Sequence, residues 1–156
     1  MNIFFVIILI ALVAEYLLGI VANLLNLKAL GQEPPDELAG VYESEEYRKS
    51  QDYSRATTRF GFVSDTFSLG LLAVFWFVGG FDYLDGVVRE WGLHSISTGI
   101  LYIGILAVGQ TLLTLPLSAY STFVVEERFG FNKTTPRTFA VDRVKGLVLA
   151  VVLGAP

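Results

Sequence analysis

The sequence predicts an all-α, multi-pass transmembrane protein with three complete spans and the start of a fourth. Composition is the first observation: 53% of the residues are hydrophobic, mean hydropathy is +0.58, and 17% are charged, compared with about 25% in soluble domains. The second is three apolar stretches, each long enough to cross a hydrocarbon core of about 30 Å. The third is that Lys and Arg gather in alternate connections, as expected for spans with a fixed orientation.

The three complete spans are predicted at residues 3–25, 60–81 and 97–118. The first contains sixteen Leu, Ile, Phe or Val residues, and their summed transfer free energy outweighs the cost of the acid Glu15. The second begins with a polar patch around Asp65, which we expect near the membrane interface. The third contains Pro116, which removes one helical hydrogen bond and predicts a kink.

Two polar segments, residues 26–59 and 120–145, are predicted to face the cytoplasm. Each carries five of the eleven Lys and Arg residues, whereas the connection between the second and third spans carries only Arg89. The positive-inside rule therefore places the N-terminus outside. The basic residues of the two segments are Lys28, Arg48, Lys49, Arg55 and Arg59, then Arg128, Lys133, Arg137, Arg143 and Lys145.

Local signals within these segments predict a turn at residues 31–35, a helix over residues 41–60 that leads into the second span, and a tight turn at Gly130. Thr135 followed by Pro136 predicts an N-cap and the first helical position of a last helix. That helix would enter the apolar run 146–156. Its 11 residues reach about half the hydrocarbon thickness, so we expect the chain to be the front part of a longer protein.

Several kinds of chemistry are excluded or unsupported. The chain has no cysteine, and its net charge of −4 with a pI near 4.9 argues against nucleic acid as a partner. His94 is the single histidine, and we interpret it as an ordinary residue of the outer membrane interface. The sequence therefore contains no candidate catalytic, cofactor-binding or metal-binding residue.

Three stretches resemble the N-terminal half of the CAAX prenyl protease 1 family, which are integral-membrane zinc metalloproteases: NLLNLKAL, PPDELAGVYESEEYRKSQDYSRATTRF, and YSTFVVEERFGFNKTTPRTFAVDRVKG with the LVLAVVLGAP that follows. The resemblance implies a seven-span helical barrel around a water-filled chamber, with a zinc site that cuts peptide or protein substrates near their C-terminus. The zinc would belong to the full-length protein, because this chain lacks the H-E-x-x-H pair that such a site requires. We expect the chain alone to be proteolytically inert.

Seven residues are candidates for a supporting role. Intramembrane polar residues normally face a bundle interior or an aqueous cavity, so Glu15 and Gln110 are predicted to line the chamber, with an interhelical hydrogen bond as the alternative. A charged cluster in the second cytoplasmic segment is predicted to contact the missing catalytic half, although such a cluster is equally compatible with a solvated surface. It comprises Glu126, Glu127, Arg128, Asn132 and Lys133.

We therefore expect the non-catalytic N-terminal membrane region of a larger metalloprotease, occupying residues 1–156 and forming part of the chamber wall. Its partners would be the lipid bilayer, the C-terminal catalytic half of the same protein and, in the full-length protein, a substrate. The alternative is a stand-alone small membrane scaffold or binding subunit without protease activity. The absence of long insertions favours a bacterial inner membrane as the location.

Overall fold

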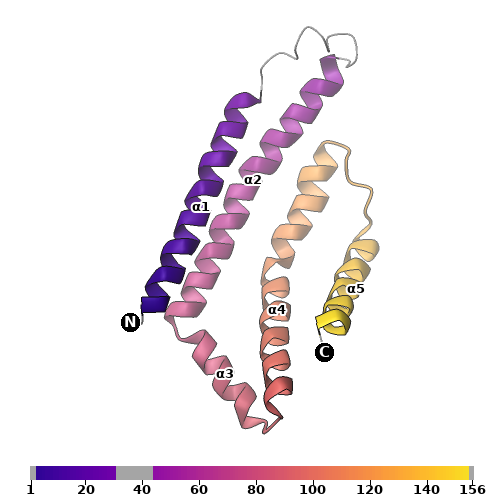
Figure 1. Cartoon of the computed structure of the whole chain (residues 1–156). Coiled ribbons are helices and arrows are strands. Elements are labelled where there is room, and N and C mark those ends of the chain that lie inside the picture. The colour runs from indigo at the N-terminus through magenta and orange to yellow at the C-terminus, as the bar shows by residue number, and fades with distance from the viewer. Residues whose placement is uncertain (1–2, 31–43, 155–156) are drawn as a thin grey trace. The chain divides into compact units, whose positions relative to one another are not determined.

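The computed structural model describes residues 3–30 and 44–154, and every regular element in these ranges is helical, which confirms the all-α prediction (Figure 1). The chain divides into two compact units, Met1–Leu69 and Gly70–Pro156. The predicted turn at residues 31–35 and the first residues of the helix predicted over 41–60 lie outside the described ranges.

The first unit pairs α1 (Ile3–Ala29) with most of α2 (Ser44–Phe77). Partly covered residues recur along α1 at intervals of three or four, which is the spacing of one helix face. On that face the Tyr16 hydroxyl lies 2.6 Å from Thr66 Oγ1, and Thr66 in turn donates a hydrogen bond to the Phe62 carbonyl, also at 2.6 Å. The two helices therefore lie side by side, with a polar contact within the apolar stretch.

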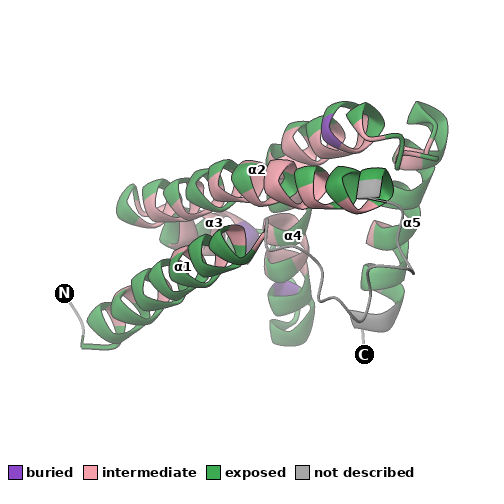
Figure 2. Ribbon diagram, turned by 90° about the horizontal axis from the view of Figure 1, so that it is seen from above, coloured by how far each residue is buried: buried purple, intermediate pink, exposed green. Residues whose placement is uncertain are grey.

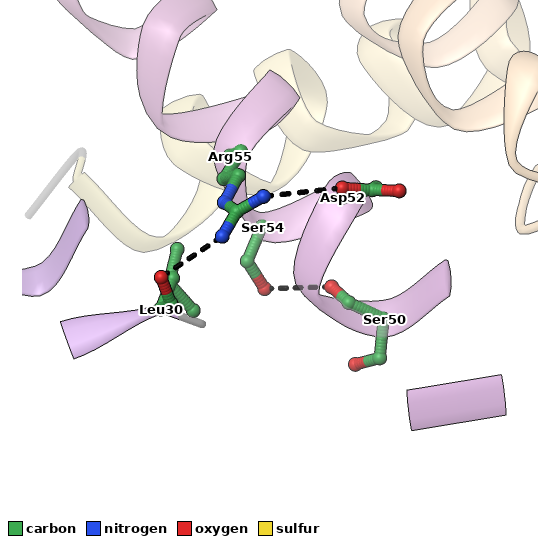
Figure 3. A network of polar contacts seen from close by, with 5 residues as sticks. All are labelled: Leu30, Ser50, Asp52, Ser54 and Arg55. Carbon is green, nitrogen blue, oxygen red and sulfur yellow. Dashed lines mark hydrogen bonds and ion pairs between the residues drawn. The ribbon is translucent and has the colours of Figure 1, made fainter. Parts of the chain in front are cut away.

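Arg55 makes a second connection in the first unit, near the end of α1 (Figure 3). Its guanidinium donates a hydrogen bond to the Leu30 carbonyl at 2.9 Å and lies 3.5 Å from the Asp52 carboxylate. The last carbonyls of a helix lack intrahelical donors, and a cation there also complements the helix dipole. Arg55 thus caps α1 from α2.

The helix α2 starts in the polar segment and continues without interruption to Phe77, so the predicted lead-in helix is confirmed from Ser44 onward. It ends four residues before the expected end of the second span. Val78 and Gly79 form a turn in which Gly79 adopts φ +76°, and a new helix begins at Gly80. A Cβ at Gly80 would lie 2.5 Å from the Phe75 ring, so a larger residue here would displace that ring.

The second unit contains the end of α2, the short helix α3 (Gly80–Glu90), α4 (Ser95–Tyr120), the π-helix η2 (Ser121–Glu126) and α5 (Pro136–Gly154). Sequence reasoning did not predict α3, whose apolar side packs against α4 and buries Val88 completely. Its polar side carries Arg89, which bonds Asp85 at 2.7 Å. This hydrogen bond and the Asp85 charge raise the pKa of Arg89.

Most side chains of the described helices are exposed or only partly covered (Figure 2). The buried ones are Val88, Thr98 and Val125. Large apolar side chains on the surface of long helices are typical of contact with lipid, since the bilayer offers them an apolar environment without burial in protein. Three helices in the described ranges are long and apolar enough to cross a membrane: Ile3–Ala29, Glu45–Phe77 and Ser95–Glu126.

Candidate functional site

The candidate site is the segment between the end of α4 and the first turns of α5. The helix formed by α4 and η2 is not straight along its length (Figure 1), and Pro116 lies inside α4. The helix then widens into the six-residue π-helix η2. Such π-turns are rare and frequently occur at functional sites. Proline at a helix interior and a π-turn are both recognised causes of a helix bend.

A glycine turn ends this helix. Gly130 has φ +70°, its N–H donates to the Glu127 carbonyl at 2.9 Å, and the Phe131 N–H donates to the Glu126 carbonyl at 3.0 Å. These two bonds, together with the left-handed backbone of Gly130, form a Schellman C-cap. The predicted tight turn at Gly130 is confirmed.

The residues after the turn are held by Asn132. Its Nδ2 donates to Glu127 Oε2 at 2.9 Å, and its Oδ1 accepts from the Thr134 N–H at 2.7 Å. The first bond closes the loop onto the helix end, and the second forms an Asx turn. Two of the five predicted contact residues, Glu127 and Asn132, are therefore brought together. We call this pair of bonds the Asn132 clasp.

The beginning of α5 follows the sequence prediction. Thr135 Oγ1 accepts a hydrogen bond from the Thr138 N–H at 3.2 Å, which makes Thr135 the N-cap and Pro136 the first helical residue. The Phe139 ring meets the Phe123 ring of η2 edge to face, with 5.3 Å between the centroids. This contact fixes α5 against the end of α4.

The other three predicted contact residues do not join the clasp. The Arg128 guanidinium lies 5.8 Å from the Phe129 ring centroid, and Lys133 is exposed. Within the described ranges the side chains of Glu126 and Lys133 make no hydrogen bond or ion pair. The loop is therefore ordered by its own bonds while three charges stay available on its surface.

The two predicted chamber-lining residues lie in different units, and each is exposed. Glu15 is on α1, next to Tyr16 in sequence but outside the face that meets α2. Gln110 is on α4, and its backbone carbonyl accepts a hydrogen bond from Thr114 Oγ1 at 2.9 Å. In the described part of the chain, the Glu15 carboxylate makes no hydrogen bond or ion pair.

No group of three His, Cys, Asp or Glu side chains that could hold a metal gathers within the described ranges. His94 precedes α4, where its carbonyl accepts hydrogen bonds from the backbone and the hydroxyl of Thr98. Within the described ranges, His94 therefore has no neighbouring ligands with which it could hold a zinc ion.

Besides α3 and the end of α2, sequence reasoning missed the π-helix and the Arg55 cap on α1. The π-helix has no simple composition signal, although Pro116 a few residues earlier marks a place where regular hydrogen bonding is already broken. The Arg55 contact joins residues 25 positions apart across the undescribed segment. No local pattern predicts such a pairing.

The three long apolar helices of the described ranges define an integral-membrane helical protein. Comparison with known families identifies one that matches. Its model, described as "CAAX prenyl protease N-terminal, five membrane helices", matches residues 23–156. The match covers most of the chain, so the chain belongs to this family, and the resemblance inferred from the sequence is confirmed.

Individual relatives agree. CAAX prenyl protease 1 of Saccharomyces cerevisiae is 35% identical over 133 residues, which cover 78% of this chain and 29% of that protein. The CAAX prenyl protease 1 homolog of Arabidopsis thaliana is also 35% identical, over 78% of this chain and 30% of its own length. The crystal structure of S. mikatae Ste24p superimposes with a TM-score of 0.81 at 30% identity, covering 93% of this chain and 35% of that chain. The chain thus spans about a third of these relatives.

Proposed function

We propose that this chain is the non-catalytic N-terminal membrane part of an integral-membrane zinc metalloendopeptidase that acts on peptide or protein substrates, and that it forms part of the wall of a chamber. The family match over residues 23–156 carries this proposal, because the matched relatives are named as prenyl proteases and extend well beyond the matched region. The zinc and the catalytic residues would lie in the remainder of the full-length protein.

The polar loop supplies the proposed contact with that remainder. The Asn132 clasp and the Gly130 cap hold its backbone, so the backbone of the loop loses little conformational freedom when a partner docks. Arg128 and Lys133 offer donors and Glu126 an acceptor that the described residues leave without an ion pair. This arrangement suits a polar interface between two parts of one protein.

Cross-linking in the full-length protein tests the docking proposal. A photo-reactive amino acid at Lys133 is expected to cross-link to residues beyond position 156, and the same group at Glu90, on exposed α3, serves as the matched control. Cross-links to lipid or solvent only at position 133, together with unchanged activity after reversing the charges of Glu127 and Arg128, would refute the docking role.

The mass of the native protein separates this proposal from the stand-alone scaffold. A native species far heavier than 17.2 kDa, detected by immunoblot of source membranes, is expected. A native species of 17.2 kDa would instead support a small binding subunit. Zinc-dependent peptidase activity from the purified chain alone would contradict its non-catalytic role.

The proposed chamber-lining role of Glu15 and Gln110 is supported by their polarity within spans and their exposure. Glu15→Cys is expected to react with a water-soluble thiol reagent in the full-length protein. Val13→Cys, at a 41% exposed position on the opposite side of α1, is expected to resist. Equal resistance at both positions would place Glu15 in a dry helix interface instead.

The orientation and the cellular membrane also stay predictions. The distribution of Lys and Arg favours an outside N-terminus, and labelling a cysteine placed near Ile3 from each side of sealed vesicles tests it. The absence of long insertions favours a bacterial inner membrane, while the relatives named above come from yeasts and a plant.

A further inference from the structure

The first half of α5 carries three basic residues that the protein itself does not neutralise. Arg137, Arg143 and Lys145 are exposed, and no carboxylate lies within ion-pair distance of them in the described ranges. In the same unit, the basic residue of α3, Arg89, is paired with Asp85 at 2.7 Å. We call the three α5 residues the basic collar.

The helix geometry adds to this imbalance. The first turn of α5 contains no acidic residue, and Arg137 sits at the end of the helix where the backbone dipole is positive. Arg143 is held with its guanidinium 4.9 Å from the Phe139 ring, which is itself packed on Phe123. Asp142 is the one acidic residue in this stretch and forms no ion pair within the described ranges, so three positive charges and a positive helix end outweigh a single negative charge.

We infer the depth of the collar from the sequence, taking the start of the apolar run of α5 as the edge of the hydrocarbon core. The apolar run of α5 begins at Gly146. At about 1.5 Å per residue, Arg143 and Lys145 lie within about 5 Å of Gly146 along the helix, and Arg137 lies about 14 Å from it. The polar headgroup layer is about 6 Å thick on each side of the hydrocarbon core. Arg143 and Lys145 thus fall in the headgroup layer, and Arg137 lies within about a Debye length above it.

We propose that the basic collar binds the headgroups of anionic phospholipids in the adjacent leaflet. The phosphate groups of such lipids lie at the depth of Arg143 and Lys145, and their negative charge matches what the collar lacks. Basic side chains next to a span each strengthen binding to an anionic membrane surface by about fivefold. The proposal uses none of the residues assigned to the docking loop and stands whether or not that docking occurs.

Fluorescence quenching by brominated lipids in the full-length protein tests it. A fluorophore on Val148→Cys, which is 55% exposed and just beyond the collar, reports the lipids bound there, in a chain that has no other cysteine and with any later cysteines replaced. Brominated phosphatidylglycerol is expected to compete about tenfold better than brominated phosphatidylcholine at about 0.05 M salt, and this preference should shrink at about 0.5 M salt. Ile103 lies in the first half of α4 and is 66% exposed. A label on Ile103→Cys should be quenched about equally by the two brominated lipids.

Matched variants assign the effect. The triple variant R137Q/R143Q/K145Q should bring the ratio at position 148 close to one, and the charge-retaining R137K/R143K/K145R should keep it. Equal ratios in wild type and the glutamine variant would overturn the proposal. Loss of the preference on adding millimolar inorganic phosphate at constant ionic strength would also overturn it, because the collar would then be a site for soluble phosphate. No preference in wild type, with lower thermal stability of the glutamine variant in neutral lipid, would show that protein covers the collar and would likewise overturn it.

Discussion

The Asn132 clasp allows a quantitative test of whether the polar loop is pre-ordered. Glu127→Ala removes the acceptor of the Asn132 Nδ2 bond at 2.9 Å while leaving the Asx bond to Thr134 in place. The lost bond is exposed, so we assign it about 1 kcal/mol, within the range for a net hydrogen bond. A change of this size increases the population of the open loop about fivefold.

Hydrogen exchange at the Thr134 amide measures this opening, because that N–H is bonded to Asn132 Oδ1 at 2.7 Å. We expect its exchange to be about fivefold faster in Glu127→Ala and less than twofold faster in Glu127→Gln, which keeps an acceptor. Asn132→Asp should accelerate exchange more than Glu127→Ala, because it keeps the Asx acceptor, loses the donor and sets a second carboxylate against Glu127. The double variant should be no faster than either single one, as expected for two partners of one bond.

Two outcomes would contradict this reasoning. If Thr134 exchange in Glu127→Ala equals that of the wild type while Asn132→Ala accelerates it, the contact with Glu127 does not stabilise the loop. If the effects of Glu127→Ala and Asn132→Asp add fully, the two side chains act independently. Either result would mean that the Glu127–Asn132 bond does not pre-order the loop for docking.

Three further predictions concern the fold. Gly130→Ala is expected to destabilise the loop by about 1–2 kcal/mol, because its φ of +70° costs this much for an L-residue, and a proteolysis rate at the loop equal to wild type would contradict it. Arg55→Ala should lower the free energy of unfolding in detergent by about 1–2 kcal/mol through loss of the bond to Leu30, with Arg55→Gln, which keeps a donor, less affected. Tyr16→Phe should cost only about 0.6 kcal/mol, the average for hydrogen bonds between membrane helices, and a loss above about 2 kcal/mol would show that the hydroxyl has a larger role.

Local rules predicted much of this structure. The Thr135 cap, the Gly130 turn and the continuous helix from Ser44 depend on side chains within a few residues of one another, which is the range that sequence patterns report. The end of α2 at Phe77 was not predicted, because the apolar run FWFVGGF continues through the turn and hydropathy does not change there. The adjacent glycines Gly79 and Gly80 were the one local signal in the sequence that the helix ends here.

The candidate site was predicted only in part. A cluster of charges in residues 126–133 is visible in the sequence, and the structure brings Glu127 and Asn132 together. Which side chains pair within the loop depends on the Schellman cap and on the contact of Phe123 with Phe139, which are properties of packing. The chamber roles of Glu15 and Gln110 stay predictions, because they concern surfaces that face outward from the described residues.

The π-helix has a consequence for how residues of this chain are matched to those of relatives. A π-turn holds one residue more than an α-turn, so every side chain after Ser121–Glu126 is turned by about 100° relative to an uninterrupted α-helix. A relative with a purely α-helical end would align with this chain after a single-residue gap. An ungapped alignment would pair Glu127 and Arg128 with residues that point in different directions, and roles transferred by position alone would be assigned to the wrong side of the helix.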